Sequence, residues 1–73
     1  MKRYEIEIDV MLEIADETKF TTIRIQTYAK NSKNAIAKIM LSFMDTSFIK
    51  MATGIYNIES WEFLGIGKVE IIK

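Results

Sequence analysis

The sequence predicts an α+β fold of ββαββ order, with a four-stranded, mainly antiparallel sheet and one helix packed on one face. Three observations support this prediction. Residues 4–14 alternate in polarity, residues 35–48 carry apolar side chains at helical spacing, and residues 55–72 form two β-rich runs around a pair of glycines. The length of 73 residues indicates a single small domain, residues 1–73.

The first two strands are expected to form a hairpin. Residues 4–14 alternate with a period of two, and a turn-like tetrapeptide at 15–18 leads into a second β-rich run at 19–29. One side of the first run carries Tyr4, Ile6, Ile8, Val10, Leu12 and Ile14, and the other carries Glu5, Glu7, Asp9, Met11 and Glu13. The apolar side is expected to form the inner face of the sheet, under the helix.

The register of this hairpin follows from the length of its turn. Pairing Ile14 with Lys19 places Arg24 opposite Asp9 on the outer face. The apolar positions of both strands then share the inner face, so the pattern and the register agree.

The helix is expected to begin at Asn31 or Ser32, either of which can accept a hydrogen bond from the free amides of the first turn. The apolar stripe that would lie on the sheet consists of Ile36, Ile39, Met40 and Phe43. Met40 and Met44 are interpreted as core residues that fill gaps. Residues 46–53 are ambiguous, and the helix is predicted to end near Phe48.

The last two strands, residues 55–64 and 68–72, are expected to form a second hairpin around the loop Gly65, Ile66 and Gly67. The second glycine would take the left-handed conformation that such a loop requires. In this register Glu62 lies opposite Glu70 on the outer face, a mildly unfavourable pair. The inner face would carry Trp61, Phe63, Val69 and Ile71.

The composition argues against catalysis. The chain has no His and no Cys, which removes the commonest general base, thiol nucleophiles and zinc ribbons. The carboxylates of residues 5–9 fit a solvated strand face better than a metal site. We therefore expect no enzyme activity, cofactor, metal site or small-molecule substrate.

Neither a signal peptide nor a membrane span is expected. Charged residues interrupt the N-terminal segment, and no run of 18 apolar residues occurs. Together with the absence of cysteine, this favours a cytoplasmic protein that is not embedded in a membrane.

The outer face of the predicted sheet is the candidate contact surface. Ten acidic and ten basic residues balance overall, but the acidic ones concentrate on the strands and lysines surround the helix. The outer face also carries more large apolar side chains than water alone would favour. The candidate partner-binding residues are Met11, Phe20, Arg24, Tyr28, Glu62 and Glu70.

These patterns favour a small non-catalytic module that binds another protein or itself as a homo-oligomer, consistent with an accessory or inhibitor protein from a phage or mobile element. One alternative is a nucleic-acid-binding module that uses Arg24, Tyr28 and the helix lysines Lys33 and Lys38. The acidic sheet argues against it, because carboxylates repel a phosphate backbone. Another alternative is a non-catalytic subunit of a larger enzyme complex.

Overall fold

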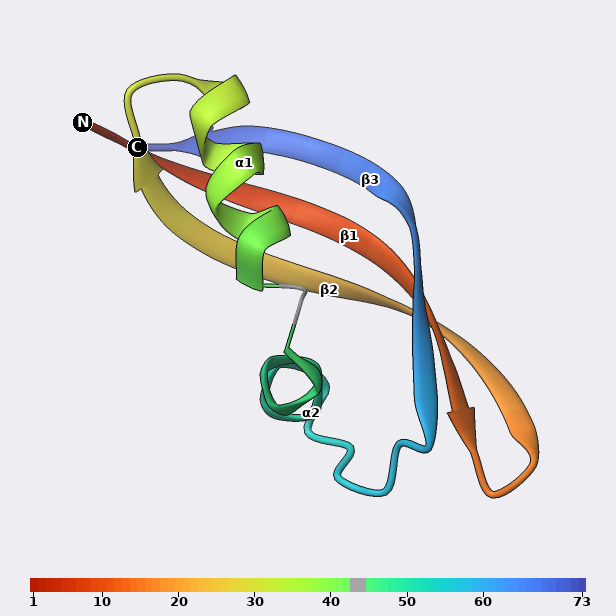
Figure 1. The fold of residues 1–73 in the computed structure, drawn as a ribbon. Coiled ribbons are helices and arrows are strands. Elements are labelled where there is room, and N and C mark those ends of the chain that lie inside the picture. Colours follow the sequence, from red (N-terminus) through yellow and green to blue (C-terminus); the bar gives the residue numbers. More distant parts are fainter. Residues whose placement is uncertain (43–44) are drawn as a thin grey trace.

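The computed structural model describes residues 1–42 and 45–73, which form three antiparallel strands and two helices (Figure 1). The elements are β1 (Lys2–Ile14), β2 (Glu17–Ala29), α1 (Ser32–Ser42), α2 (Thr46–Thr53) and β3 (Ser60–Ile72). The strand order is β2-β1-β3, so the first strand is central. The prediction of a four-stranded ββαββ sheet with one helix is therefore wrong, although the fold is still a small α+β fold.

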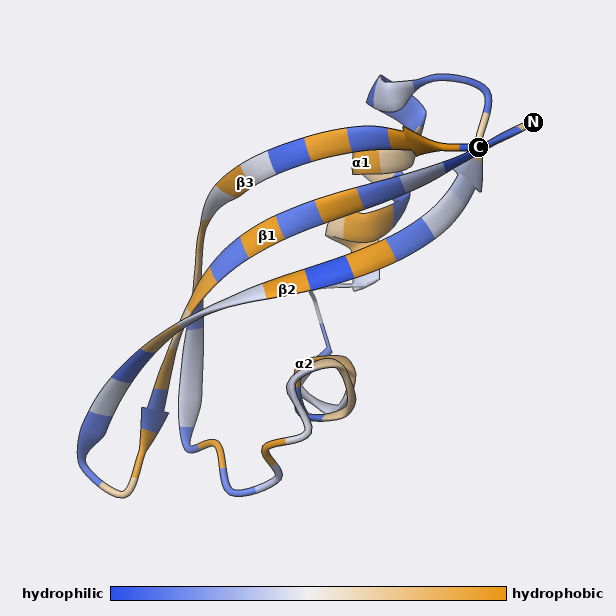
Figure 2. Cartoon of the chain, turned by 180° about the vertical axis from the view of Figure 1, so that it is seen from behind, coloured by the Kyte–Doolittle hydropathy of each residue, from blue (hydrophilic) through white to orange (hydrophobic). Residues whose placement is uncertain are grey.

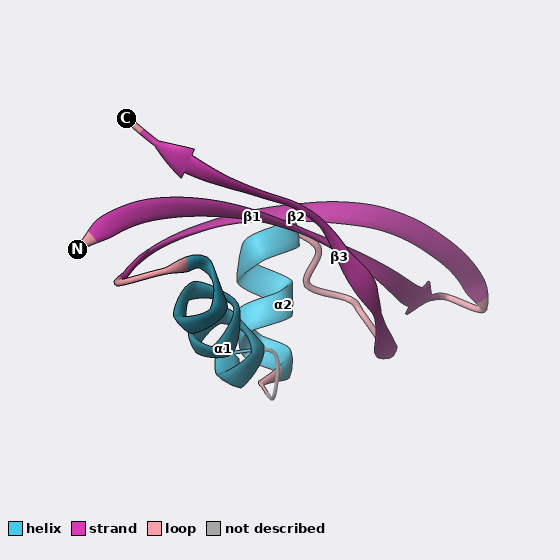
Figure 3. Ribbon diagram, turned by 90° about the horizontal axis from the view of Figure 1, so that it is seen from above, coloured by secondary structure: helices cyan, strands magenta, loops and turns pink. Residues whose placement is uncertain are grey.

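Both helices lie on the same side of the sheet (Figure 3). They follow each other in the connection that carries the chain from β2, at one edge, to β3, at the other. The molecule is elongated, with extents of 41 × 19 × 17 Å. No described helix is long and apolar enough to cross a membrane. Within the described residues, the side of the sheet opposite the helices has no covering element.

The first hairpin is tighter than predicted. Ile14 pairs with Glu17, so the loop is only Ala15 and Asp16, which both have positive φ (50° and 65°). Positive φ at both central residues is the geometry of a type I′ turn, whose twist matches that of the flanking strands. The predicted register is wrong by two residues, and Arg24 lies opposite Glu7. A shift of two keeps every side chain on its predicted face.

The start of α1 is as predicted. The side chain of Asn31 accepts a hydrogen bond from the backbone N–H of Asn34 at 2.9 Å, which satisfies one of the free amides of the first turn. Ala35 and Ile39 are buried under the sheet, and Ile36 packs against the core. The predicted roles of Phe43 and Met44 fall outside the described residues.

A second helix replaces the predicted extension of the first. α1 ends at Ser42, and the Asp45 side chain accepts from the N–H of Ser47 at 2.9 Å to begin α2. The helix then ends at Gly54, whose φ of 74° is left-handed and whose N–H donates to Lys50 O at 2.9 Å. The prediction of one helix that ends near Phe48 is wrong because a strong capping residue inside the segment starts a new helix.

Residues 60–72 form one long strand, not a hairpin. Leu64 and Gly67 have no partner on β1, so each is the extra residue of a bulge, and the same strand continues beyond both. Among the glycines only Gly54 has positive φ, so the predicted left-handed Gly67 is wrong. Glu62 lies opposite Met11, and Glu70 lies opposite Glu5. The predicted pairing of Glu62 with Glu70 is therefore wrong.

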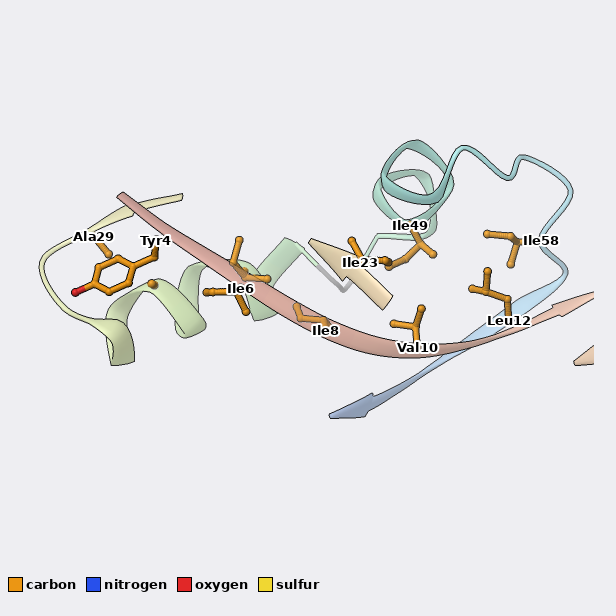
Figure 4. Packing of buried hydrophobic residues seen from close by; sticks show 11 residues of the cluster. Tyr4, Ile6, Ile8, Val10, Leu12, Ile23, Ala29, Ile49 and Ile58 are labelled. Atoms are coloured by element: carbon orange, nitrogen blue, oxygen red, sulfur yellow. The ribbon is translucent and has the colours of Figure 1, made fainter. Parts of the chain in front are cut away.

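The core lies between the sheet and the helices. The alternation along β1 is visible in Figure 2, and the side chains of its even-numbered positions from Tyr4 to Leu12 are all buried. Ile49 of α2 and Ile58 lie on the same side of β1 as Val10 and Leu12 (Figure 4). Ile58 precedes β3, is 7% exposed and belongs to the core.

Candidate binding face of the sheet

The outer face is the side of the three-stranded sheet that points away from the helices. On the central strand it carries Arg3, Glu5, Glu7, Asp9, Met11 and Glu13. Their partners on β2 are Tyr28, Gln26, Arg24, Thr22, Phe20 and Thr18, and those on β3 are Ile72, Glu70, Lys68, Gly65, Glu62 and Ser60. Six carboxylates and three cations therefore share this face, which gives it an acidic character.

Two ion pairs hold the centre of the outer face. Arg24 Nε donates to Glu7 Oε1 at 2.8 Å across the hairpin, and Lys68 Nζ lies 2.5 Å from Glu70 Oε1 along β3. The hydrogen bond to Glu7 raises the pKa of Arg24, and that to Glu70 raises the pKa of Lys68. Both cations are paired with carboxylates of the same chain, so neither is an isolated positive charge on the face.

Two of the acids away from the centre, Asp9 and Glu13, accept hydrogen bonds from threonines. Thr22 Oγ1 donates to Asp9 Oδ1, and Thr18 Oγ1 donates to Glu13 Oε1, each at 2.8 Å. These cross-strand hydrogen bonds fix the side chains without neutralising them. The negative charge at Asp9 and Glu13 therefore remains on the surface in a defined position.

A partly open hollow of about 190 Å³ lies at the centre of the outer face. Its lining is entirely charged and consists of Glu5, Glu7, Arg24, Lys68 and Glu70. Within residues 1–42 and 45–73, no group of carboxylates is arranged to hold a metal ion. The hollow suits polar contacts with a partner's side chain more than enclosure of a small molecule, since ligand sites are mostly apolar and bury their ligand.

The six candidate partner-binding residues all lie on the outer face, but in three places. Phe20, Met11 and Glu62 form one row near the tip of the hairpin. Phe20 is 68% exposed and Met11 is half-buried beside it. Arg24 and Glu70 belong to the central hollow. Tyr28, 58% exposed, lies at the far end of the sheet opposite Arg3.

The residues of the nucleic-acid alternative are not gathered on one surface. Arg24 lies on the outer face, while Lys33 and Lys38 are on α1, across the sheet. The Lys38 ammonium donates to the backbone carbonyl of Tyr28 at 2.6 Å, so it caps the end of β2. The four groups are therefore divided between two sides of the sheet and share no strip along which a phosphate backbone could run.

One surface was missed by the sequence reasoning. An open hollow of about 500 Å³ lies at the junction of the helices, and Leu41 and Met51 beside it are 75% and 72% exposed. Its lining consists of Leu41, Ser42, Asp45, Phe48 and Met51. The available signal was that Leu41 lies outside the apolar stripe of its helix and so has no place in the core.

No protein family, curated protein or solved structure matches this chain significantly.

Proposed function

We propose that the protein is a small non-catalytic binding module that attaches to a partner protein through the outer face of its sheet. The observation that carries this proposal is the one-sided cover of the sheet. Both helices lie on the inner side, while the outer face exposes two aromatic rings, Phe20 and Tyr28, on either side of a charged centre. Aromatic side chains are enriched at protein interfaces, where they often contribute much of the binding energy.

The charge of the face favours a basic partner. Six carboxylates outnumber three cations there, and Arg24 and Lys68 are already paired with Glu7 and Glu70. Two copies stacked face to face would repel each other, as would a nucleic acid. A partner with lysine or arginine side chains would instead be attracted to the face.

The chemistry of the face also supports a binding role over a catalytic one. Each of its carboxylates is at least partly exposed to solvent, and the centre is a hollow open to water. Catalytic acids and bases usually need burial to bring their pKa values near the working pH. A cytoplasmic accessory protein, for example from a phage or mobile element, remains the setting we propose.

Affinity capture with matched variants tests the proposal. The immobilised protein is incubated with a nuclease-treated lysate of its source organism, and the captured proteins are compared with those bound by the Met11→Lys, Tyr28→Lys double variant. This variant adds two positive charges to the outer face and should lose the partner. Circular dichroism should show an unchanged fold, because neither side chain belongs to the core.

Lys33→Glu is the control, because it changes the charge of α1 on the other side of the sheet. It should retain the partner. The proposal fails if the double variant captures the same proteins as the unmodified chain, or if the control is the one that loses them.

A further inference from the structure

We propose that the free edge of β3 pairs with the same edge of a second copy, which would join two sheets into one of six strands. β3 is an edge strand. In the described part of the chain, no strand pairs with the edge of β3 that points away from β1. An edge strand presents a row of backbone N–H and C=O groups that can pair with another strand. The backbone contact runs along the edge of β3 and needs no other protein, and its flanking side chains Lys68 and Glu70 also belong to the outer face.

The two edges of the sheet are not equivalent. Both helices pack against β2, so the inner side of that edge is covered. On β3 the inner-face residues Ile66 and Ile71 are 37% and 51% exposed. Apolar side chains at an open edge are the sign of an association site. A second copy at this edge would cover Ile71, and this favours β3 over β2.

The charges of β3 favour the β3 strand of a second copy as the partner of this edge. Lys68 and Glu70 flank Val69 on the outer face. In an antiparallel pair centred on Val69, this residue lies opposite its own copy, and each Lys68 lies opposite Glu70 of the other copy. The symmetry produces this match twice, and opposite charges directly across two strands stabilise them.

The same register places Ile71 opposite Gly67 of the second copy. Gly67 has no side chain and is the extra residue of a bulge, so Ile71 would meet no opposing side chain at this position. The bulges at Leu64 and Gly67 also set the limit of the contact, since bulges disrupt regular pairing and twist a strand. The paired segment is therefore short, residues 67–71, and the dimer should dissociate on dilution.

Charge reversal tests this register. Sedimentation equilibrium over a range of protein concentrations measures the dimer dissociation constant of the unmodified chain and of Lys68→Glu, Glu70→Lys and the variant with both changes. Each single reversal creates two like-charge pairs at the dimer axis and should weaken the dimer about tenfold or more. The double reversal restores both pairs and should recover the affinity to within about threefold.

Lys19→Glu is the control, because it reverses an exposed charge on β2, the other edge. It should leave the dissociation constant unchanged. Circular dichroism checks the fold of every variant. Glu70→Lys keeps the comparison valid even if Lys68→Glu is poorly folded, since a lysine at that position would lie opposite Glu5 within its own sheet.

A cysteine at the axis gives a second, independent readout. The chain has no cysteine, so Val69→Cys should form an intermolecular disulfide on mild oxidation, whereas Lys19→Cys should form far less. A chain that stays monomeric at every concentration would overturn the proposal. Single reversals without effect, or a double reversal that fails to recover, would also overturn it.

Discussion

Arg24 and Glu7 lie opposite each other in the hairpin, and Arg24 Nε donates to Glu7 Oε1 at 2.8 Å. The pair lies at the centre of the outer face and lines its hollow. Glu7 neutralises Arg24, which is one of the three cations on the face. The surrounding carboxylates therefore determine the net charge that a partner meets. Replacing either member therefore changes the charge of the face without touching the core.

Arg24→Gln should strengthen binding to a basic probe. The substitution removes a positive charge and leaves Glu7 unpaired, so the face becomes more negative. Titration with a lysine-rich peptide at low salt, measured by calorimetry, should show a tighter complex than with the unmodified chain. Glu62→Gln is the opposite control and should weaken it. Both effects should fade as salt is added.

Lys68 should titrate at a higher pH in the unmodified chain than in Glu70→Gln. Its hydrogen bond and charge interaction with Glu70 raise its pKa, and the amide of glutamine removes the negative charge. Because a raised folded-state pKa favours the charged form, the stabilisation by this pair is present at neutral pH and is lost only as the pH rises through that pKa. NMR of the lysine side chain measures the shift, and equal titration in both proteins would contradict it.

Ile8→Ala should destabilise the fold by roughly 2 to 5 kcal/mol. Ile8 is fully buried on β1 between Ile23 and Ile66, so its loss leaves a cavity at the middle of the sheet. Urea denaturation followed by circular dichroism measures the change. Ile66→Ala is the matched control, because this side chain is 37% exposed, and it should cost clearly less. Equal losses would mean that the inner face is packed differently.

Gly54→Ala should destabilise by about 1 kcal/mol, whereas Gly65→Ala should be nearly neutral. Gly54 ends α2 with φ of 74°, a conformation that L side chains rarely adopt. Gly65 lies in β3, has no positive φ, and a Cβ there would meet nothing within 4 Å. Thermal or urea denaturation separates the two cases. A hairpin at residues 65–67 would instead make Gly67→Ala damaging, because its loop needs a left-handed residue at that position.

Replacing Ala15 by Asn and Asp16 by Gly together should stabilise the protein by about 1 kcal/mol or more. Both positions have positive φ, where alanine is strained, while Asn-Gly is the preferred pair for this turn. Urea denaturation measures the gain. Destabilisation would mean that the loop is longer than two residues.

The division of the sheet into two faces could be predicted from the sequence because it depends only on side-chain alternation. Ile6, Ile8 and Val10 are buried as expected, and the acids between them point outward. The register could not be predicted correctly, because the chain turns at Ala15 and Asp16 without the Asn or Gly that marks a two-residue turn.

The path of residues 55–72 was mispredicted for a different reason. Two glycines around Ile66 are typical of a hairpin loop, but in β3 they accompany two bulges. The bulges move the inner-face positions from Phe63 to Ile66 and then to Val69, so simple alternation does not describe the strand. The sequence offers one sign that favours a single long strand over a hairpin. The first strand, β1, is long, so its edge can pair with another strand of equal length.

The candidate residues were placed on the correct face because a register error of two residues preserves the faces. Their grouping was not predictable, since it depends on which strands are neighbours. Glu62 joins Phe20 through Met11, and Glu70 joins Arg24 in the central hollow, only because β1 lies between β2 and β3.

Methionine methyl NMR tests the role of the outer face most directly, because the chain carries a reporter on each surface. Met11 lies on the outer face, Met40 on α1 and Met51 at the hollow between the helices. On addition of the captured partner, the Met11 methyl signal should shift while those of Met40 and Met51 stay in place. A shift of Met51 with Met11 unchanged would contradict the account and assign binding to the helices.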